Sequence, residues 1–545
     1  MSVVTATILS EGQPMDPLYE LLSLDITKEV NRIPHAQLML LDGDLAHNTL
    51  PISDTAFFEP GKTIEIKLRY EGEADQEATV FKGLVLKHSV ERDAQGTVLT
   101  IALKDAASKL TRTRRSKVYH DQTDADILRG IIREHSLTSG TVATTDPKHA
   151  EIVQYYCTDW DFLVMRAETQ GLLVVVDDGH IALPRLAVSG QPQHRFTYGT
   201  SEIYNIEIEV DASHQHSGVE SIAWDIKDQK QTPASKAKTF ALSQGNLKGD
   251  TVAEAIGAQT YTLTAPVSLA PEELQAWADA RLARSRMAMI RGRLSVPGLA
   301  AIKPLDVIEL AGVGTRFNGT TLVTGIRHRV NTQGWLTDVQ FGLSPERFAA
   351  QEGIVDVPAA GLLPAVHGLQ LGVVDAFTED PDKQLRVKVL LAGIAQEAVW
   401  ARLASPEAGK ERGYVFQPEP GDEVVVGFFN DDPRQAVILG ALYSSKNTLP
   451  TAVGKVTKDN ITKAIVTKKG TVIKFLDNDK PAVHIETPAK NTIVLDDEAQ
   501  TIRLADQHGN KLTLSKDGIT IESAKDVTIK ASGNVDITGQ KVDIK

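Results

Sequence analysis

The chain has 545 residues, of which 42% are hydrophobic and 24% charged, and this composition is typical of a globular protein with several domains. Its formal net charge of -13 argues against general nucleic-acid binding, because phosphate contacts need a basic surface. The one cysteine, Cys157, excludes internal disulfides and metal sites built from several cysteines. No apolar stretch approaches the ~20 residues of a membrane span, and the N-terminus lacks a secretory signal pattern. We therefore expect assembly in the cytoplasm.

The first part of the chain, residues 1–120, is expected to form a β-barrel. Apolar and polar residues alternate in three of its segments, residues 36–40, 63–68 and 97–103. Such alternation predicts strands with one buried face.

Two helix starts follow, and they predict a small α/β insertion over residues 121–190. Thr123 precedes Asp126, and Thr158 precedes Asp161, at the three-residue spacing of a capping box. Gly171 is expected to close the second helix, and residues 172–176 to form a strand.

Residues 191–350 are expected to form a second barrel that carries a helix beginning at Pro271. The segment from Pro60 through Phe81-Lys82-Gly83 parallels the segment from Pro304 through Phe317-Asn318-Gly319. If this repeat is real, the two barrels are related; chance similarity between β meanders is the alternative.

A linker over residues 351–365 separates these barrels from a third. Five short strands are predicted in the 82 residues of 366–447, at residues 368–377, 385–391, 399–403, 423–429 and 437–442. Five strands in so short a stretch favour a barrel of the OB type.

The last region, residues 448–545, repeats one small pattern. From about Val472 onward, pairs of apolar residues flank a single residue and are followed by a polar stretch. Residues i and i+2 of a strand share a face, so each unit is a short strand with one apolar side. One chain cannot bury all these sides, because ordering each residue costs about 1–2 kcal/mol of backbone entropy. We therefore predict an intertwined oligomeric needle with a dry core formed by Ile493, Leu495, Ile502, Leu504, Leu512, Leu514, Ile519, Ile521, Val527, Ile529, Val535, Ile537, Val542 and Ile544.

Two motifs give the chain a family resemblance. Residues 419–428, which begin Glu419-Pro420-Gly421-Asp422, and the following residues 432–443 closely resemble the OB domain of VgrG-type spike proteins and phage baseplate spikes. Residues 154–171 are similar to the hub signature of the same family. With the repetitive tail, the resemblance covers nearly the whole chain in the family's domain order.

The resemblance implies a mainly β protein with two hub barrels, a small α/β insertion, an OB-fold collar and a C-terminal trimeric β-helix needle. It implies a structural homotrimer, not an enzyme, that joins a hexameric inner tube and baseplate proteins to a membrane-puncturing needle. A PAAR-type tip protein is expected on Val542, Ile544 and Lys545, and effectors are optional cargo. No cofactor, metal or nucleic acid is expected. The place of action is a secreted or extracellular injection particle, or a virion tail.

Several alternatives remain open from the sequence. The setting is a type VI secretion spike, a free extracellular particle or a phage tail, and a cell-wall hydrolase within residues 190–260 is the rival function. The basic segment from Arg112 to Lys117 is interpreted as a solvated loop or an inter-subunit ion-pair surface. Gly61-Lys62-Thr63 matches only the end of a phosphate-binding loop and is expected to open a strand. His214 and His216 lack further ligands for zinc and are assigned to a surface loop.

Overall fold

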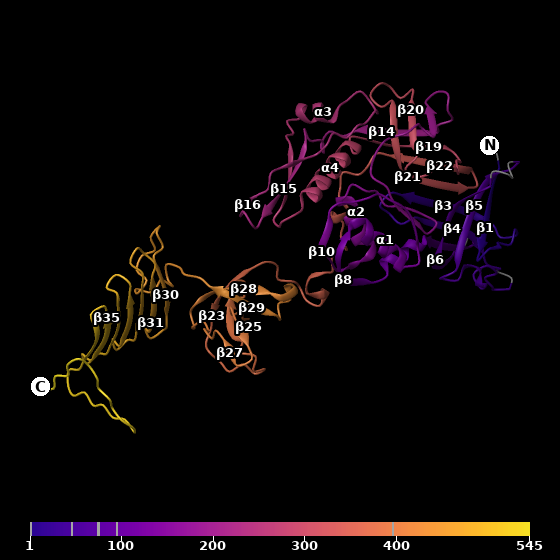
Figure 1. Cartoon of the computed structure of the whole chain (residues 1–545). Helices are drawn as coiled ribbons and strands as arrows, with labels where there is room; N and C mark the ends of the chain where they lie inside the picture. The colour runs from indigo at the N-terminus through magenta and orange to yellow at the C-terminus, as the bar shows by residue number, and fades with distance from the viewer. Residues whose placement is uncertain (1–2, 45–46, 73–76, 94–95, 395–396) are drawn as a thin grey trace. The chain divides into compact units, whose positions relative to one another are not determined.

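The computed structural model describes residues 3–44, 47–72, 77–93, 96–394 and 397–545. Strands dominate its secondary structure (Figure 1). The chain divides into two compact units, Met1–Asp356 and Val357–Lys545, which are described separately.

The first sheet of unit 1 is antiparallel, and the three predicted alternating segments are confirmed as strands in it. Ile26, Leu38, Ile66 and Phe81 are fully buried in its core. The strands, in chain order, are β1 (Val4–Ser10), β2 (Gln13–Pro14), β3 (Leu21–Glu29), β4 (His35–Asp42), β5 (Thr63–Tyr70), β6 (Ala78–Arg92) and β7 (Thr97–Lys104). They pair in the order β3-β4-β7-β6-β5-β1-β2. The segment Gly61-Lys62-Thr63 leads into β5, as predicted.

A second sheet in unit 1 repeats this order. Its strands are β13 (His194–Thr197), β14 (Asn205–Val210), β19 (Ile290–Pro297), β20 (Val307–Ala311), β21 (Gly319–Asn331) and β22 (Gly334–Phe341). They pair in the order β14-β19-β22-β21-β20-β13. Strand β21 also pairs antiparallel with β3, so the described strands join into one 13-stranded sheet (Figure 1).

The internal repeat is visible in the register of these strands. The pairing of β6 with β7 shifts between Val85 and Lys87, and that of β21 with β22 shifts between Val323 and Gly325. The partner strands start correspondingly: Leu84 lies opposite Thr63, and Leu322 opposite Val307. The two sheets therefore share their strand order and this bulge, but β13 pairs parallel with β20, whereas β1 pairs antiparallel with β5 at the corresponding place.

The predicted alignment of Phe81 with Phe317 is wrong by two residues. Phe81 lies opposite Ile66, and the corresponding position opposite Leu310 is Gly319. The glycine of the shared Phe-x-Gly pattern is required for a different reason in each copy. A Cβ on Gly83 would lie 2.5 Å from the carbonyl oxygen of Lys104, whereas one on Gly319 would lie 2.2 Å from that of Ser243.

The α/β insertion has its own core, and both predicted capping boxes are confirmed. The hydroxyl of Thr123 accepts the Asp126 N–H, and that of Thr158 accepts the Asp161 N–H. The elements are η3 (Ala106–Thr111), β8 (Arg114–Thr123), α1 (Asp124–Glu134), β9 (Thr138–Val142), β10 (Lys148–Thr158), α2 (Asp159–Thr169), β11 (Val175–Asp177) and β12 (His180–Leu183). The predicted strand over residues 172–176 begins only at Val175, because Leu172 forms just an isolated bridge with Arg185.

The helix predicted from Pro271 is confirmed as α4 (Pro271–Met287). Leu274 and Leu282 bury its apolar side against β15 (Val219–Asp225) and β18 (Tyr261–Ala265). The sequence did not predict this layer or three further elements, β16 (Lys230–Gln231), β17 (Ser235–Lys236) and α3 (Gly249–Ala255). Short helical turns η1 (Ala56–Phe58) and η4 (Phe348–Ala350) complete unit 1.

Unit 2 begins with the five-stranded barrel that the sequence predicted. The barrel closes in the order β23-β24-β25-β29-β28 around Val389, Val424 and Val426. Its strands are β23 (Gln370–Val374), β24 (Val387–Leu391), β25 (Ala398–Leu403), β28 (Glu423–Phe428) and β29 (Ala436–Ala441), with β26 (Ala408–Gly409), β27 (Arg412–Gly413), η5 (Pro358–Gly361) and η6 (Phe429–Asp431) around them.

The repetitive tail forms an antiparallel meander within one chain. Its seven strands of five residues pair in chain order (Figure 1). They are β30 (Thr462–Val466), β31 (Val472–Leu476), β32 (Ala482–Glu486), β33 (Thr492–Asp496), β34 (Thr501–Ala505), β35 (Lys511–Ser515) and β36 (Gly518–Glu522). The pattern thus starts one strand earlier than the sequence indicated, and residues 523–545 contain no strand.

A buried histidine in unit 1 predicts a pH dependence of stability. His328 is 1% exposed beside Thr337, and burial together with the charge of Lys28 lowers its pKa to about 4. Between about pH 6.5 and pH 4 only the unfolded chain binds this proton, so the free energy of unfolding should fall by up to about 3 kcal/mol as pH falls.

The variant His328→Gln should flatten this part of the pH profile, measured by chemical unfolding of unit 1 signals between pH 4 and 7. The exposed His120→Gln is the matched control and should keep the full slope. An unchanged slope in His328→Gln would contradict a neutral His328 in the folded chain.

Candidate functional site

The predicted apolar pairs of the tail up to Ile519 and Ile521 lie on one face of its sheet. Residues directly opposite in antiparallel strands share a face, and one row of opposite residues runs across all seven strands. That row is Ile465, Ile473, Ile485, Ile493, Leu504, Leu512 and Ile521. A second row on the same face runs Lys463, Phe475, Val483, Leu495, Ile502, Leu514 and Ile519.

The opposite face is more polar. Its central row of opposite residues is Ala464, Lys474, His484, Val494, Arg503, Thr513 and Thr520. Ion pairs such as Lys490 with Glu486 and Lys511 with Glu522 join neighbouring turns and strands. We name the other side, formed by the two rows above, the apolar face.

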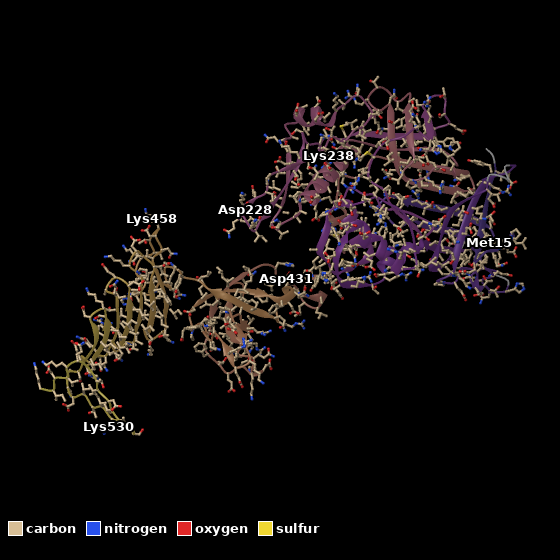
Figure 2. The ribbon with its side chains drawn as sticks, in the orientation of Figure 1. Met15, Asp228, Lys238, Asp431, Lys458 and Lys530 are labelled. Carbon is tan, nitrogen blue, oxygen red and sulfur yellow. The ribbon has the colours of Figure 1, made fainter. Side chains whose placement is uncertain are left out.

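The apolar face remains exposed within a single chain. Ile493, Leu495, Ile502 and Leu504 are 38% to 42% exposed, and Ile519 reaches 69%. A contiguous exposed apolar surface of this kind marks a protein or membrane contact. Side chains project from the tail along its length between the labelled Lys458 and Lys530 (Figure 2).

The remaining predicted core residues lie beyond the sheet. All of them are at least half exposed, and none belongs to a strand: Val527, Ile529, Val535, Ile537, Val542 and Ile544. The predicted tip-binding residues Val542, Ile544 and Lys545 are among the exposed residues. The structure thus brings the first eight predicted core residues together on one face and leaves the last six apart.

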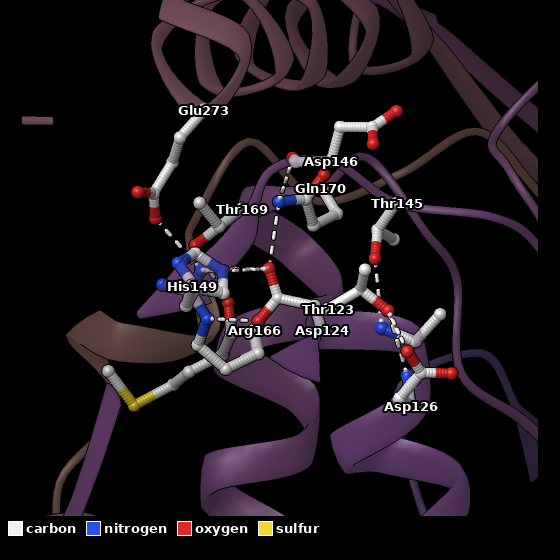
Figure 3. Close-up of polar contacts among 12 residues, drawn as sticks. Thr123, Asp124, Asp126, Thr145, Asp146, His149, Arg166, Thr169, Gln170 and Glu273 are labelled. Atoms are coloured by element: carbon white, nitrogen blue, oxygen red, sulfur yellow. Dashed lines mark hydrogen bonds and ion pairs between the residues drawn. The ribbon is translucent and has the colours of Figure 1, made fainter. Parts of the chain in front are cut away.

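A buried ionic cluster lies where the insertion meets α4 (Figure 3). Asp124, at the start of α1, is 0% exposed. Arg166 of α2 donates to both of its carboxylate oxygens, at 2.7 and 2.9 Å, and to Glu273 of α4 at 2.8 Å. Gln170 and His149 also bond Asp124. The cluster ties α1, α2, β10 and α4 together.

The charges in this cluster keep each other ionised. Burial raises the pKa of Asp124, but hydrogen bonds and charge from Arg166 and His149 outweigh it, and the pKa is lowered overall. Burial likewise opposes the charge of Arg166, yet Asp124 and Glu273 raise its pKa. A carboxylate with so many donors is held in place and is unsuited to proton transfer at neutral pH.

The basic segment from Arg112 to Lys117 belongs to strand β8 from Arg114 onward, which corrects the interpretation of it as a loop. None of its residues is buried, but its cations find partners within the chain. The other interpretation, an inter-subunit ion-pair surface, stays a prediction. Arg115 donates to Asp159 at 2.6 Å and pairs with Glu134 at 2.8 Å, and Lys117 pairs with Glu134 at 2.6 Å. The guanidinium of Arg114 donates to the carbonyl oxygen of Ile354 at 2.7 Å. These cations form ion pairs because β8 places them beside Glu134 at the end of α1 and Asp159 at the start of α2.

The other candidate groups are placed as follows. Cys157 packs against the core of the insertion, and burial raises the pKa of its thiol. His214 is exposed, while His216 is half-buried and stacks on Tyr261 at 4.8 Å. Within the described ranges, no three His, Cys, Asp or Glu side chains are grouped so as to hold a metal ion. No described helix has the length and apolar character that crossing a membrane requires.

Removing the Arg166 cation from this cluster should lower the free energy of unfolding strongly. Arg166→Met leaves Asp124 charged and buried, so unfolding free energy should fall by about 3–5 kcal/mol in chemical unfolding of the full chain. The double variant Asp124→Asn with Arg166→Met should recover part of this loss. The exposed Arg195, which pairs with Glu309, offers the control Arg195→Met, with a loss below about 1 kcal/mol. Equal losses for both arginines would contradict the structural role.

Three family models match the chain. The Alg8 N-terminal domain matches residues 1–332. The type VI secretion system/phage-baseplate injector OB domain matches residues 370–443. The phage baseplate V C-terminal trimerisation domain matches residues 482–545.

Curated relatives include three spike proteins of Pseudomonas aeruginosa. Type VI secretion system spike protein VgrG5 is 38% identical over 96 residues, 16% of this chain and 12% of the relative. VgrG1b is 22% identical over 63% of this chain and 48% of the relative, and VgrG1a is 22% identical over 72% and 63%. The chain therefore spans less than two thirds of the length of these relatives.

Two solved structures are similar to parts of this chain. A tail protein of Neisseria meningitidis shares 15% identity, with a TM-score of 0.46, over 64% of this chain and 98% of that one. An Escherichia coli component of the type VI secretion system shares 12% identity, with a TM-score of 0.40, over 80% and 99%. By its family models and curated relatives, the chain belongs to the Alg8 N-terminal domain family and is a VgrG-type spike protein.

Proposed function

We propose that three copies of this chain form the hub and spike at the tip of the inner tube of a contractile injection system. The observation that carries this proposal is the apolar face of the tail, which its own chain leaves exposed. The trimerisation-domain match over residues 482–545 falls on the same segment. The role is structural, and it requires no catalysis from the chain.

In the needle, the three apolar faces turn inward and enclose a dry core. Full burial of an aliphatic side chain contributes roughly 1.5–3 kcal/mol, so the shared core offsets the cost of ordering the tail. The predicted core residues from Ile493 to Ile544 supply this interior. Residues 523–545 gain strand partners only from the other copies, so we assign them to an intertwined end.

The hub matches a trimer to a hexameric tube. Each chain carries two sheets with the same strand order, so three chains present six similar units. We assign the hub barrels to residues 1–120 and 191–350, the insertion to 121–190, the linker to 351–365, the OB collar to 366–447 and the needle to 448–545. The inner tube protein binds the hub, and baseplate proteins surround it.

The needle's end receives a tip protein. Val542, Ile544 and Lys545 are exposed and offer apolar contacts and a charge to a PAAR-type cap. Effectors are carried by the same assembly. The needle contacts and punctures the target membrane. The proposed place of action is the exported particle, after assembly in the cytoplasm.

Charges inside the needle should separate the copies. Ile521→Asp with Ile529→Asp would bury carboxylates without partners, and the full chain should lose its SDS-resistant trimer and show a lower mass by light scattering. Thr520→Asp with Thr528→Asp is the matched control, because Thr520 lies in the polar central row of the same strand and Thr528 directly precedes Ile529. Stable trimers in both double variants would refute the dry core.

Electron microscopy of the purified full chain should show a threefold particle with a slender spike. A zymogram on peptidoglycan tests the rival hydrolase in residues 190–260, and the structural role predicts no clearing. Clearing of the substrate by the intact chain, abolished by deleting these residues, would favour the enzyme instead.

A further inference from the structure

A small pocket in unit 1 lies between α2, α4 and the turn η4. Its volume is about 130 Å³. Met165 of α2 and Trp277 of α4 give it an apolar wall. Of the ten described residues that line it, five are charged, and four of these are arginines: Arg166, Glu168, Arg281, Arg284 and Arg347. The pocket therefore combines an excess of positive charge with apolar surface.

Two of these arginines already have carboxylate partners. Arg166 pairs with Asp124 and Glu273 (Figure 3). Arg284 pairs with Glu168, and the side chains of these two residues are 12% and 13% exposed. The guanidinium of Arg284 also donates to two backbone carbonyl oxygens in the segment before η4, each at 3.0 Å. These contacts fix one side of the pocket in the absence of a ligand.

The other two arginines form no ion pair in the part of the chain that the structure describes. Arg281 donates to the carbonyl oxygen of Pro345 at 3.2 Å and lies over the ring of Tyr261, 5.6 Å from the ring centroid. Arg347 is exposed directly before η4. Burial lowers the pKa of Arg281, and the charges of Arg347 and Arg284 lower it further. An anion held between these side chains would relieve their repulsion.

We infer that this pocket binds a carboxylate of a partner protein, carried by an acidic side chain or by a chain end, next to an apolar residue. Arg281 and Arg347 supply the cations, and Trp277 supplies the apolar contact. All the lining residues belong to one chain, so the inference does not depend on the proposed trimer.

The size and chemistry of the pocket favour this occupant. Small-molecule sites usually measure about 300–1,000 Å³, so a volume of about 130 Å³ suits one inserted side chain better than a larger free ligand. A planar guanidinium matches a carboxylate with two parallel hydrogen bonds. The apolar wall offers burial to a neighbouring aliphatic side chain, which hydrated inorganic anions lack.

Saturation-transfer NMR on the full chain, at low salt, tests the inference with short peptides. Acetyl-Leu-Glu-Leu-amide carries a side-chain carboxylate, and acetyl-Leu-Leu with a free C-terminus represents a chain end. Their neutral counterparts are acetyl-Leu-Gln-Leu-amide and acetyl-Leu-Leu-amide. At least one acidic peptide should bind roughly tenfold more tightly than its neutral counterpart, because hydrogen bonds to charged groups are the stronger ones. The acidic peptide that binds identifies the source of the carboxylate.

Substitutions locate the binding. Arg347→Glu should abolish it without unfolding the chain, because this side chain is exposed, and Arg281→Gln should weaken it roughly tenfold. Arg316→Glu is the matched control, since Arg316 is also exposed and lies outside the pocket, and it should bind as the wild type does. Failure of both acidic peptides to bind, equal binding of acidic and neutral peptides, or equal losses in Arg347→Glu and Arg316→Glu would overturn the inference.

The double variant Ile521→Asp with Ile529→Asp shows whether a second copy of the chain occupies the pocket. This variant, designed to separate the copies, should bind the acidic peptide as the wild type does. Binding by the variant alone would mean that a neighbouring copy fills the pocket in the wild-type assembly, and it would overturn the assignment to a separate partner. A monomeric wild-type chain that binds the peptide would support the inference and refute only the trimer.

Discussion

The structure depends on an apolar surface that one chain cannot cover. The tail places its branched and aromatic side chains in two rows on one side of a seven-stranded sheet, and its own fold supplies nothing that packs on them. A globular domain solves this problem with a second layer. In the proposed trimer the second layer comes from other copies, so assembly and folding of the tail would be one process. Beyond β36 even the backbone lacks strand partners, and this makes the far end the part most dependent on association.

Unit 1 is organised differently, because buried ion pairs within its own chain join its elements. Asp124, Arg166 and Glu273 connect the insertion to α4, and Arg115 with Asp159 connects the two helices of the insertion to β8. Buried ion pairs are costly to desolvate and add little net stability. Their value lies in fixing how elements meet, which would suit the proposed hub. The acidic balance of the chain leaves these cations matched to specific carboxylates.

Local patterns predicted the strands, caps and OB barrel well, since Thr123, Thr158 and the alternating segments act within a few residues. The apolar pairs of the tail also predicted their shared face, because strand geometry alone decides it. Three features were not predicted correctly from the sequence. The basic segment near Arg115 was misassigned because its partners are distant in sequence. The layer of β15 to β18 has short, irregular strands with weak alternation. The repeat was placed two residues out of register because Gly83 and Gly319 are required by different close contacts.

In the proposed trimer, the repeat would let a threefold spike meet a sixfold tube. A duplicated sheet within each chain would turn three subunits into six similar surfaces without requiring six needles. The two sheets meet inside the chain at the seam of β21 with β3, where Arg329 lies opposite Asp25. This seam forms as the chain folds, so the pairing of the two sheets does not depend on assembly. The tail, in contrast, gains a second layer only in the proposed trimer.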